Sequence, residues 1–543
     1  MNYNELANLL FPDIITTVNE IEEKYPKRNL KEGAIVTRFA PSPTGFLHIG
    51  GLYGALIDER LAHLSGGIFY LRIEDTDQKR EIEGAVELLI NNFKDFGVVF
   101  DEGAVIDGDN GNYGPYRQRQ RENIYKTFAK QLVSEGKAYP CFCSEEQLSL
   151  NHSEQEQIKA NFGYYGQWAK HRDFSLEEIK KELNNGKSFV LRLKSNGNAK
   201  NIIKIKDLIK GELQLYENDQ DIVLLKSDGI PTYHFAHILD DYLMGTTHIV
   251  RGEEWLSTFH WHLQLFEAIG KEPPKYLHTA HIMKNEDGAK RKLSKRKDPE
   301  SAVSYYKENG YPAIAVNEYL MTLLNSNFEE WKRTNPTLSY KDFPFSIKKI
   351  SVSGSLFDLL KLRDISKNII ANMTTSQIVT EILNWAKEFD AEFYKLLNRD
   401  INYTNSIFAI GRGVKKPRKD IACFSEVKNY CSFFFDELFQ VECDYPENIS
   451  KQDVTAILQG FSKVYDINDD NSLWFSKVKE IASSLGFASE TKDYRENPSA
   501  FKGSVADVSM VIRIAITGRQ NSPDLHTVMQ ILGKERAIFR MRI

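Results

Sequence analysis

Residues 37–57 constrain the fold of this chain more than any other stretch, because a strand, a rigid turn and a helix start follow one another there. Residues 35–39 are mostly β-branched or aromatic, which predicts a short buried strand. Residues 41–45, Pro-Ser-Pro-Thr-Gly, can neither continue a strand nor begin a helix, so they predict a turn. From His48 onward, apolar residues recur at helical spacing. Backbone N–H groups and the positive end of the helix dipole then meet at one place, which predicts a phosphate-binding site.

The residues at this helix start are of the types that a phosphate site needs. Gly50 and Gly51 let a nucleotide lie against the backbone, and His48 can donate a hydrogen bond to a phosphate. A His-Ile-Gly tripeptide alone is more typical of an ordinary turn with a surface histidine. A second segment lies about 240 residues later, where six of the eight residues from 290 to 297 are basic. Such a run is usually a solvated loop, so neither segment is decisive by itself.

Together, His48-Ile-Gly-Gly and Lys292-Leu-Ser-Lys295-Arg resemble the two ATP-binding signatures of class I aminoacyl-tRNA synthetases. The residues around them resemble glutamyl-tRNA synthetases in particular, from about residue 35 to the C-terminus. The resemblance implies an α/β fold, with a Rossmann-type nucleotide-binding catalytic domain that is split by an α+β insertion and followed by an all-α anticodon-binding region. The other matching segments are Arg72–Asp77, Pro231–His234, Val250–Trp255 and Leu532–Arg536.

The hydrophobic pattern and the resemblance together predict five segments. The first is a helical extension that most bacterial members of the family lack, and we expect it to pack on the catalytic domain, with partner binding as the alternative. The segments are the extension (1–33), the first half of the catalytic domain (34–116), an acceptor-binding insertion (117–230), the second half with the lysine loop (231–355) and an α-helical anticodon-binding region (356–543).

Composition sets limits on the class of protein. A chain of 543 residues is expected to hold three or four domains. The net charge of −5 does not indicate a nucleic-acid-binding protein, so any RNA contact must come from local basic patches. Five scattered cysteines favour a reducing compartment, and we find no signal peptide and no apolar run that could span a bilayer. We therefore expect a cytoplasmic protein, acting as a monomer without membrane contact.

The resemblance implies a glutamate–tRNA ligase that works in two steps. The carboxylate of L-glutamate attacks the α-phosphate of ATP to give glutamyl-adenylate, and the 3′ end of tRNA(Glu) then takes the acyl group. Positioning and charge neutralisation carry such a reaction, and no side-chain nucleophile is required. The expected catalytic residues are His48, Lys292 and Lys295, and the expected ATP-binding residues, acting on ATP with Mg²⁺, are His48, Gly50, Gly51 and Lys295.

Two arginines lie at the ends of predicted buried strands, where an unpaired guanidinium is costly. Arg38 and Arg251 each need a carboxylate, supplied either by the substrate or by a nearby Asp or Glu. The resemblance favours the side-chain carboxylate of glutamate, and it implies that Glu74 receives the α-ammonium group. The residues expected to bind glutamate are Arg38, Ala40, Ser42, Glu74, Tyr233, His237 and Arg251, of which His237 departs from the small residues usual at its position.

A basic segment in the C-terminal half is the expected place of tRNA contact. Arg412, Lys415, Lys416 and Arg418 lie close together in the sequence. Alone, this cluster can be an exposed charged loop, but beside a synthetase-like catalytic domain we favour contact with phosphates. Residues 117–121 carry three further arginines at alternate positions, and they indicate either an RNA-facing surface or a solvated helix start.

Cys141-Phe-Cys143 is the one metal-like spacing in the sequence. Some members of the resembled family bind a structural zinc here, with two more ligands about 25 residues later. Trp168 stands where the third ligand would be, and we expect His171 to be a badly placed substitute. No zinc or other protein-bound metal is therefore expected.

Three alternative functions stay open. A glutamine-specific enzyme is the nearest, although two buried cations suit a neutral amide poorly. A truncated relative that glutamylates a modified base of tRNA would lack the anticodon-binding region. A binding protein that kept the fold and lost the chemistry would not need His48, Lys295 and Arg251 together.

Overall fold

The computed structural model describes residues 1–294 and 296–542, which divide into two compact units. Unit 1 comprises residues 1–305 and 317–358, and unit 2 comprises residues 306–316 and 359–542. No helix of the described chain combines the length and the apolar character needed to cross a membrane.

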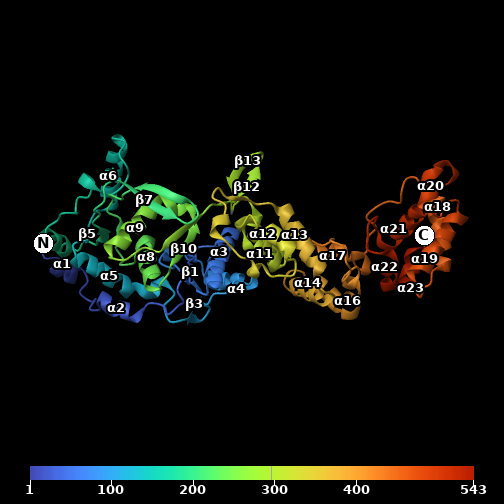
Figure 1. Cartoon of the computed structure of the whole chain (residues 1–543), viewed down its shortest axis with the longest axis horizontal. Coiled ribbons are helices and arrows are strands. Elements are labelled where there is room, and N and C mark those ends of the chain that lie inside the picture. Colours follow the sequence, from blue (N-terminus) through green and yellow to red (C-terminus); the bar gives the residue numbers. More distant parts are fainter. Residues whose placement is uncertain (295, 543) are drawn as a thin grey trace. The chain divides into compact units, whose positions relative to one another are not determined.

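Unit 1 is built on parallel strands of the Rossmann type (Figure 1). The first three strands lie side by side in the order β1, β2, β3, with β4 antiparallel at the edge of β3. β10 and β11 form a second parallel pair, and a hydrogen bond of 3.0 Å from Thr247 N to Val36 O links this pair to β1. The strands are β1 (Val36–Phe39), β2 (Ile68–Leu71), β3 (Glu102–Val105), β4 (Gly108–Asn110), β10 (His248–Gly252) and β11 (Lys275–Thr279).

The predicted strand, turn and helix are confirmed at the start of this sheet. α3 (Ile49–Ser65) follows β1, and Gly66 ends the helix with a φ of 69°. A Cβ atom on Gly67 would lie 1.9 Å from the carbonyl oxygen of Ile35, so only glycine fits where the chain enters β2.

Between β4 and β10 the chain forms a mostly antiparallel α+β region. β5, β6 and β9 make one sheet, and β7 and β8 make a hairpin. The elements are α5 (Glu122–Ser134), β5 (Ala138–Cys141), α6 (Glu145–Gln157), α7 (Leu176–Asn184), β6 (Val190–Leu193), β7 (Ile202–Asp207), β8 (Gly211–Tyr216), β9 (Val223–Leu225) and α8 (Tyr233–Leu243).

The N-terminal extension consists of α1 (Tyr3–Leu10) and α2 (Val18–Lys24). Leu6 and Ile21 are buried in one apolar cluster with Phe128 and Leu132 of α5. The extension therefore packs on α5, a helix of the predicted acceptor-binding insertion, whereas packing on the catalytic domain was expected. The remaining helices and strands before residue 358 are α4 (Ala85–Asp95), α9 (Phe259–Ala268), β12 (Ile282–Glu286), β13 (Ala289–Lys292), α10 (Val303–Asn309), α11 (Ala313–Leu324), α12 (Phe328–Thr334) and β14 (Ser355–Leu356).

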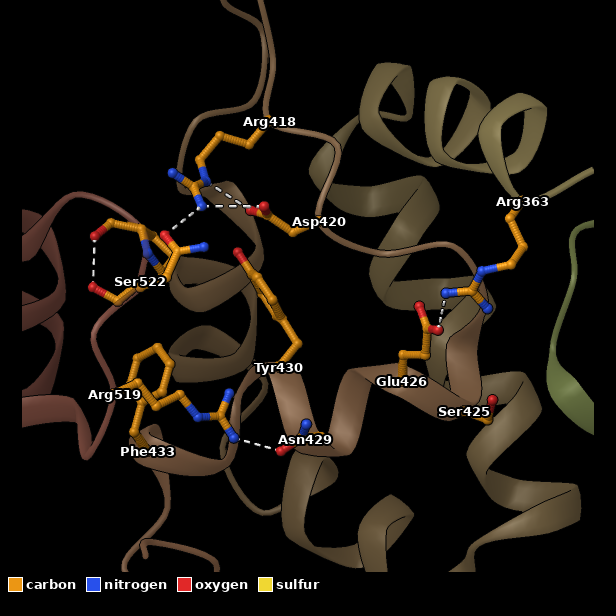
Figure 2. Close-up of a pocket in the computed structure, with 12 residues that line it drawn as sticks. Arg363, Arg418, Asp420, Ser425, Glu426, Asn429, Tyr430, Phe433, Arg519 and Ser522 are labelled. Atoms are coloured by element: carbon orange, nitrogen blue, oxygen red, sulfur yellow. Dashed lines mark hydrogen bonds and ion pairs between the residues drawn. The ribbon is translucent and has the colours of Figure 1, made fainter. Parts of the chain in front are cut away.

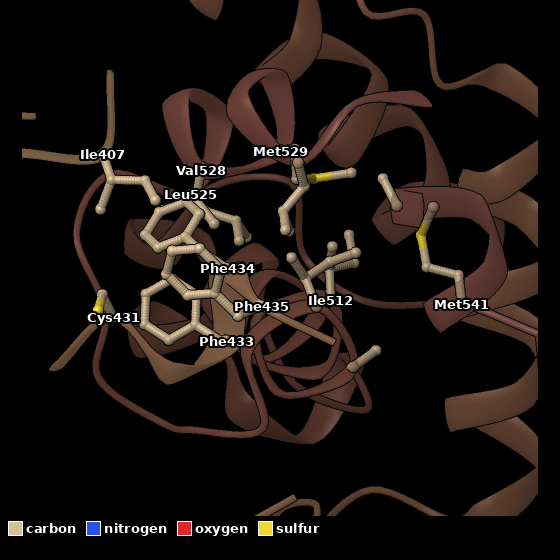
Figure 3. Close-up of a cluster of buried hydrophobic side chains, with 14 of the residues drawn as sticks. Ile407, Cys431, Phe433, Phe434, Phe435, Ile512, Leu525, Val528, Met529 and Met541 are labelled. Carbon is tan, nitrogen blue, oxygen red and sulfur yellow. The ribbon is translucent and has the colours of Figure 1, made fainter. Parts of the chain in front are cut away.

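Unit 2 is helical over its described residues. Its core is a large apolar cluster in which Phe433, Phe434 and Phe435 pack near Leu525 and Val528 (Figure 3). The helices after residue 358 are α13 (Leu359–Asn372), α14 (Thr375–Phe389), α15 (Ala391–Asn398), α16 (Ile401–Ala409), α17 (Val427–Tyr430), α18 (Lys451–Val464), α19 (Asn471–Ser484), α20 (Thr491–Glu496), α21 (Val505–Thr517), α22 (Leu525–Leu532) and α23 (Lys534–Arg540).

Candidate active site

The predicted phosphate site lies where β1 leads into α3. His48 caps the helix, and its Nδ1 accepts a hydrogen bond of 3.2 Å from Gly51 N. In a neutral imidazole this leaves the proton on Nε2, so that atom is the donor for an anion. A Cβ atom on Gly50 would lie 2.9 Å from His48 Nδ1, which explains the glycine at this position.

A cavity of about 850 Å³ lies over this helix start. It brings the two predicted ATP-binding segments together, because His48, Gly50 and Gly51 line it opposite Lys292 and Ser294. Lys295, the other predicted catalytic lysine, lies outside the described residues.

The basic run beside this cavity is partly occupied by contacts within the protein. Buried Asp298 accepts hydrogen bonds from Arg291 at 2.6 Å and from Ser294 N at 2.8 Å. These bonds, Arg291 first, hold the pKa of Asp298 below its ordinary value. Arg291 therefore stabilises the loop through Asp298, whereas Lys292 and Arg296 are exposed.

A second cavity, of about 1080 Å³, shares several lining residues with the first. Ala40, Ser42 and Arg251 line both cavities, and Glu74 and Tyr233 line the second. Arg38 also lines it, so six of the seven residues predicted to bind glutamate meet at one cavity, namely Arg38, Ala40, Ser42, Glu74, Tyr233 and Arg251.

His237, the seventh, lines neither cavity. It is fully buried, and its ring stacks on that of Tyr233 at a centroid distance of 5.4 Å. Its Nδ1 lies 2.8 Å from Asp241 Oδ2, and burial lowers its pKa to about 3. This placement favours support of the Tyr233 ring over direct contact with a substrate.

Most buried arginines near the second cavity already have a carboxylate partner. Arg38 Nε lies 3.0 Å from Asp241 Oδ1. Of the two predicted partners for Arg38, a substrate or a nearby acid of the protein, the structure therefore contains the acid. Two further arginines pair in the same way, Arg72 with Asp241 at 2.8 Å and Glu74 at 3.1 Å, and Arg121 with Asp240 at 2.6 Å.

Arg251 is different. Its side chain is buried, with 8% of its surface exposed, and among the described residues no carboxylate forms an ion pair with it. Its Nη1 lies 2.9 Å from His262 Nδ1, and its Nε donates to His278 Nε2 at 2.9 Å. Its Nη2 is buried without a hydrogen-bond partner in the described chain. A buried donor of this kind lacks the hydrogen bond that such a group normally makes, and an anionic acceptor would supply it.

Glu74 is the one acid among the predicted glutamate-binding residues. It follows β2, where Arg72 Nη2 donates to its carboxylate at 3.1 Å. Burial raises the pKa of Glu74 to about 7, although Arg72 and Arg38 act in the opposite direction. A small gain in positive charge beside it, such as an ammonium group, is enough to ionise it at neutral pH.

The sequence interpretation missed His262, His278 and Trp255. Trp255 lines both cavities and packs on Tyr233 at a centroid distance of 4.3 Å. His278 lies directly beside Arg251 in the parallel register of β10 and β11. The sequence signal for His278 was therefore its place near the end of β11, the strand that follows and pairs with the strand of Arg251.

Known proteins resemble this chain over nearly its whole length. The family model of the class I tRNA synthetases for Glu and Gln, catalytic domain, matches residues 34–337, and an anticodon-binding domain model matches residues 494–543. A glutamate–tRNA ligase of Acetivibrio thermocellus is 52% identical over 543 residues, covering 100% of both chains. The chain belongs to the glutamate–tRNA ligase family of class I synthetases.

Other members of the family match along nearly the whole chain. A glutamate–tRNA ligase of Clostridium perfringens is 51% identical and covers 98% of this chain and 99% of its own. The crystal structure of a glutamate tRNA ligase from Elizabethkingia meningosepticum in complex with its amino acid has a TM-score of 0.75 at 27% identity, covering 93% of this chain and 98% of that one. The predicted Rossmann-type catalytic domain and helical C-terminal region are thus confirmed.

Cys141 and Cys143, the pair that resembles the zinc site of some family members, have a third potential ligand beside them. Cys141 Sγ, Cys143 Sγ and His171 Nδ1 lie within 4.8 Å of one another, so the expectation that His171 is badly placed is wrong. The α+β region folds the imidazole onto both thiols, at 3.7 Å and 3.4 Å. The hydroxyl of Tyr164 occupies the remaining side, 3.4 Å from Cys143 Sγ. The donor set thus offers three zinc ligands and a phenol, where structural zinc normally takes four N or S ligands.

The arginines predicted at residues 117–121 do not form an RNA-facing surface as a group. Arg121 is buried against Asp240, and Arg117 donates to the carbonyl groups of Val105 and Gly108. Arg119 pairs with Glu81. The alternative of a solvated helix start fits Arg119, which is exposed in the short helix of residues 118–121, but it does not fit buried Arg121.

In unit 2, the predicted tRNA-binding residues differ in what they contact. Arg412 donates to the carbonyl groups of Phe408 at 2.8 Å and Ile370 at 2.6 Å, near the ends of two helices. Lys415 and Lys416 are exposed. Arg418 pairs with Asp420 at 2.6 Å and lines a cavity of about 570 Å³ (Figure 2). That cavity also has Arg363, Arg519, Tyr430 and Asn521 in its lining.

Proposed function

We propose that this chain is a glutamate–tRNA ligase that activates L-glutamate with ATP and transfers the glutamyl group to the 3′ end of tRNA(Glu). The observation that carries the proposal is Arg251. It is buried, it has an unpartnered Nη2, and it lines both cavities. A buried cation without a carboxylate partner favours an anionic ligand, and the side-chain carboxylate of glutamate is such a ligand.

ATP would occupy the cavity over the start of α3. The backbone at Gly50 and Gly51, together with the Nε2 proton of His48, would contact its phosphates. Lys292 and Lys295 would approach the same phosphates from the opposite loop during attack at the α-phosphate. Mg²⁺ would be bound mainly through the phosphates of ATP, as is usual for this ion.

Glutamate would occupy the second cavity. Arg251 and Arg38 would hold its side-chain carboxylate with help from the Tyr233 hydroxyl, and Glu74 would accept its α-ammonium group. Ala40 and Ser42 line both cavities, so they would border the carboxylate that attacks ATP. We place His237 behind Tyr233, as a residue that holds the ring.

Unit 2 would bind the anticodon part of tRNA(Glu). Lys415, Lys416 and Arg418 are exposed cations in one segment, and exposed cations exchange partners readily with phosphates. Arg412 is occupied by backbone carbonyl groups, so we assign it to folding of the unit. A monomeric state and a cytoplasmic location stay predictions.

The nearest alternative is a glutamine-specific enzyme of the same family. An exchange assay between ATP and pyrophosphate separates the two, run with each amino acid and with or without tRNA. We expect exchange with glutamate and tRNA together. Equal exchange with glutamine would contradict the substrate. The resemblance to glutamyl-tRNA synthetases also implies that activation needs tRNA, and robust exchange without tRNA would contradict that expectation.

A further inference from the structure

Arg251 is held by two imidazoles, in contrast to the other buried arginines of the site. Its Nε and Nη1 each lie 2.9 Å from a ring nitrogen, of His278 and His262 respectively. Arg38, Arg72 and Arg121 instead pair with carboxylates. The sequence interpretation considered only a substrate or an internal acid as partner for Arg251, so this arrangement is a third possibility.

The donor character of arginine fixes the protons of both rings. A guanidinium can only donate, so His278 Nε2 and His262 Nδ1 must each offer a lone pair. The proton of His278 then lies on Nδ1, which is 2.7 Å from Asp207 Oδ2. The proton of His262 lies on Nε2, which is 2.9 Å from His234 Nδ1. We call Asp207, His278, Arg251, His262 and His234 the support chain.

Asp207 is a rigid anchor for this support chain. It ends β7, and its Oδ1 accepts hydrogen bonds from Ile209 N at 2.8 Å and Lys210 N at 2.7 Å. Its Oδ2 accepts from His278 N at 3.1 Å in addition to the ring proton. The carboxylate that fixes the tautomer of His278 is thus itself fixed by a hairpin turn.

The support chain orients Arg251 without neutralising it. Burial lowers the pKa of His262 well below its ordinary value. Burial also lowers the pKa of His278, although the hydrogen bond to Asp207 acts in the opposite direction. Both rings are therefore neutral at pH 7, and the positive charge of Arg251 is left for another group. A carboxylate in the place of either ring would compete with an anionic substrate.

We propose that His278 and His262 are positioning residues for substrate specificity: they hold Arg251 toward the side-chain carboxylate of the amino acid while leaving its charge uncompensated. This inference rests on the proposed role of Arg251 in binding glutamate. Neither histidine is proposed to touch the substrate. Their effect passes through the guanidinium, whose unpartnered Nη2 is the atom left for the ligand.

The test compares two substitutions of His278 in the full-length enzyme. His278→Phe keeps a ring among Phe259 and Tyr276 but removes the acceptor, whereas His278→Gln keeps an acceptor near the position of Nε2. We expect His278→Phe to raise the Michaelis constant for glutamate about ten- to hundred-fold, the size of one hydrogen bond to a charged group. The Michaelis constant for ATP should not change. His278→Gln should restore most of the affinity for glutamate, and an equal loss in both variants would overturn the inference.

A double-mutant cycle with Arg251→Gln separates this inference from the proposed function. If His278 acts through Arg251, His278→Phe should add little to the loss already caused by Arg251→Gln. Full additivity would overturn the positioning role while leaving the role of Arg251 intact. If Arg251→Gln itself does not change the preference for glutamate over glutamine, the proposed function of Arg251 fails instead.

Three further variants complete the test: one is a control for loss of structure, and two examine His262. His248→Phe removes another buried imidazole, on β10 itself, which bonds to Thr247 and belongs to neither cavity, so it should leave the Michaelis constant for glutamate unchanged. His262→Asn and His262→Leu repeat the comparison on the other side of Arg251, with and without an acceptor. If Asn and Leu weaken glutamate binding equally in folded protein, His262 has no positioning role.

Discussion

Three buried arginines of unit 1 and the arginines that line the cavity of Figure 2 in unit 2 differ in how far water reaches them and their partners. In unit 1, Arg38, Arg72 and Arg121 are buried and already paired with carboxylates. In unit 2, the arginines that line the cavity of Figure 2 are half-buried or exposed, and their partners, such as Asp420 for Arg418, are also partly open to water. Buried charges must be satisfied within the fold, whereas exposed ion pairs add little stability and exchange readily.

This difference identifies which arginine each unit offers to a ligand. Among the buried arginines at the second cavity of unit 1, the candidate is Arg251, which lines both cavities and has no carboxylate partner in the described chain. In unit 2 a cation that is already paired can also bind a ligand, because water competes with its exposed ion pair and weakens it. Under the proposed function, the small substrate would be recognised by a buried arginine without a carboxylate partner, and the tRNA by several exposed cations.

The largest effect should come from removing the charge of Arg251. Arg251→Gln should cost about 2–5 kcal/mol of transition-state stabilisation, which lowers kcat/KM for glutamate roughly thirty- to several-thousand-fold. Weak use of glutamine should suffer less, because its amide loses no ion pair and the new side chain can still hydrogen-bond. The ratio of the two efficiencies, measured in wild type and variant, is the decisive quantity.

A matched control is Arg28→Gln. Arg28 is also largely buried, but it pairs with Glu102 at 2.9 Å and lines neither cavity. The Arg28→Gln variant should be less stable than the wild type but should have the same ratio of glutamate to glutamine use. If both variants change this ratio equally, Arg251 is structural and the contrast between paired and unpaired arginines fails.

Glu74 tests whether a buried acid in the same cavity also binds a charged group of the substrate. Its pKa of about 7, raised by burial, means that the free enzyme ionises this group only as the pH rises through 7. Because the ionised form accepts the α-ammonium group, kcat/KM for glutamate should rise with pH through about 7 and then level off. Glu74→Gln should lower kcat/KM about ten- to hundred-fold, the worth of one charged hydrogen bond, and remove that step. A step that persists in the variant would assign the titration to another group.

The exposed cations of unit 2 should have a smaller, more graded effect. Replacing Lys415, Lys416 and Arg418 together with Gln should raise the Michaelis constant for tRNA about ten-fold and flatten its salt dependence, because fewer counterions are released. Glutamate binding should not change. Replacing the exposed Lys451, Lys463 and Lys492 is the control for total charge. An equal effect of both triple variants would mean that the segment has no special role.

The smallest effect is expected at the cysteine cluster, where buried polar groups satisfy one another as the paired arginines do. Cys141, Cys143, His171 and Tyr164 are already within hydrogen-bonding range. We expect purified protein to hold no stoichiometric zinc after mild chelation, with an unchanged melting temperature. One zinc per chain that is lost only with Cys143→Ser would show that three ligands and a phenol suffice.

Local signals predicted the phosphate end of the site well. The turn at residues 41–45 and the helix start at His48 each follow from the nearest few residues, and the structure has them where the sequence placed them. The partners of buried charges could not be predicted in this way. Asp241 lies 203 positions from Arg38, and nothing in the sequence of either segment names the other.

The same limit explains the errors at single residues. His171 was judged from its spacing to Trp168, whereas the fold of the α+β region decides where its ring lies. Arg412 has the composition of an RNA-binding residue but bonds to helix ends. Charge and spacing predict which chemistry is present in a segment, and only the tertiary fold determines which of those charges are already used.

The path of the chain between the units also limits how the protein can be divided. Residues 306–316 belong to unit 2, although the chain then returns to unit 1 for residues 317–358. Within unit 2, Trp385 Nε1 donates to Glu308 O at 3.0 Å, and Phe424 N donates to Gly310 O at 2.9 Å. A protein shortened at residue 358 would keep Glu308 and Gly310 but lose both of these donors. Three boundaries, after residues 305, 316 and 358, separate the two units, so a single cut at residue 358 leaves residues 306–316 without contacts that they make inside unit 2.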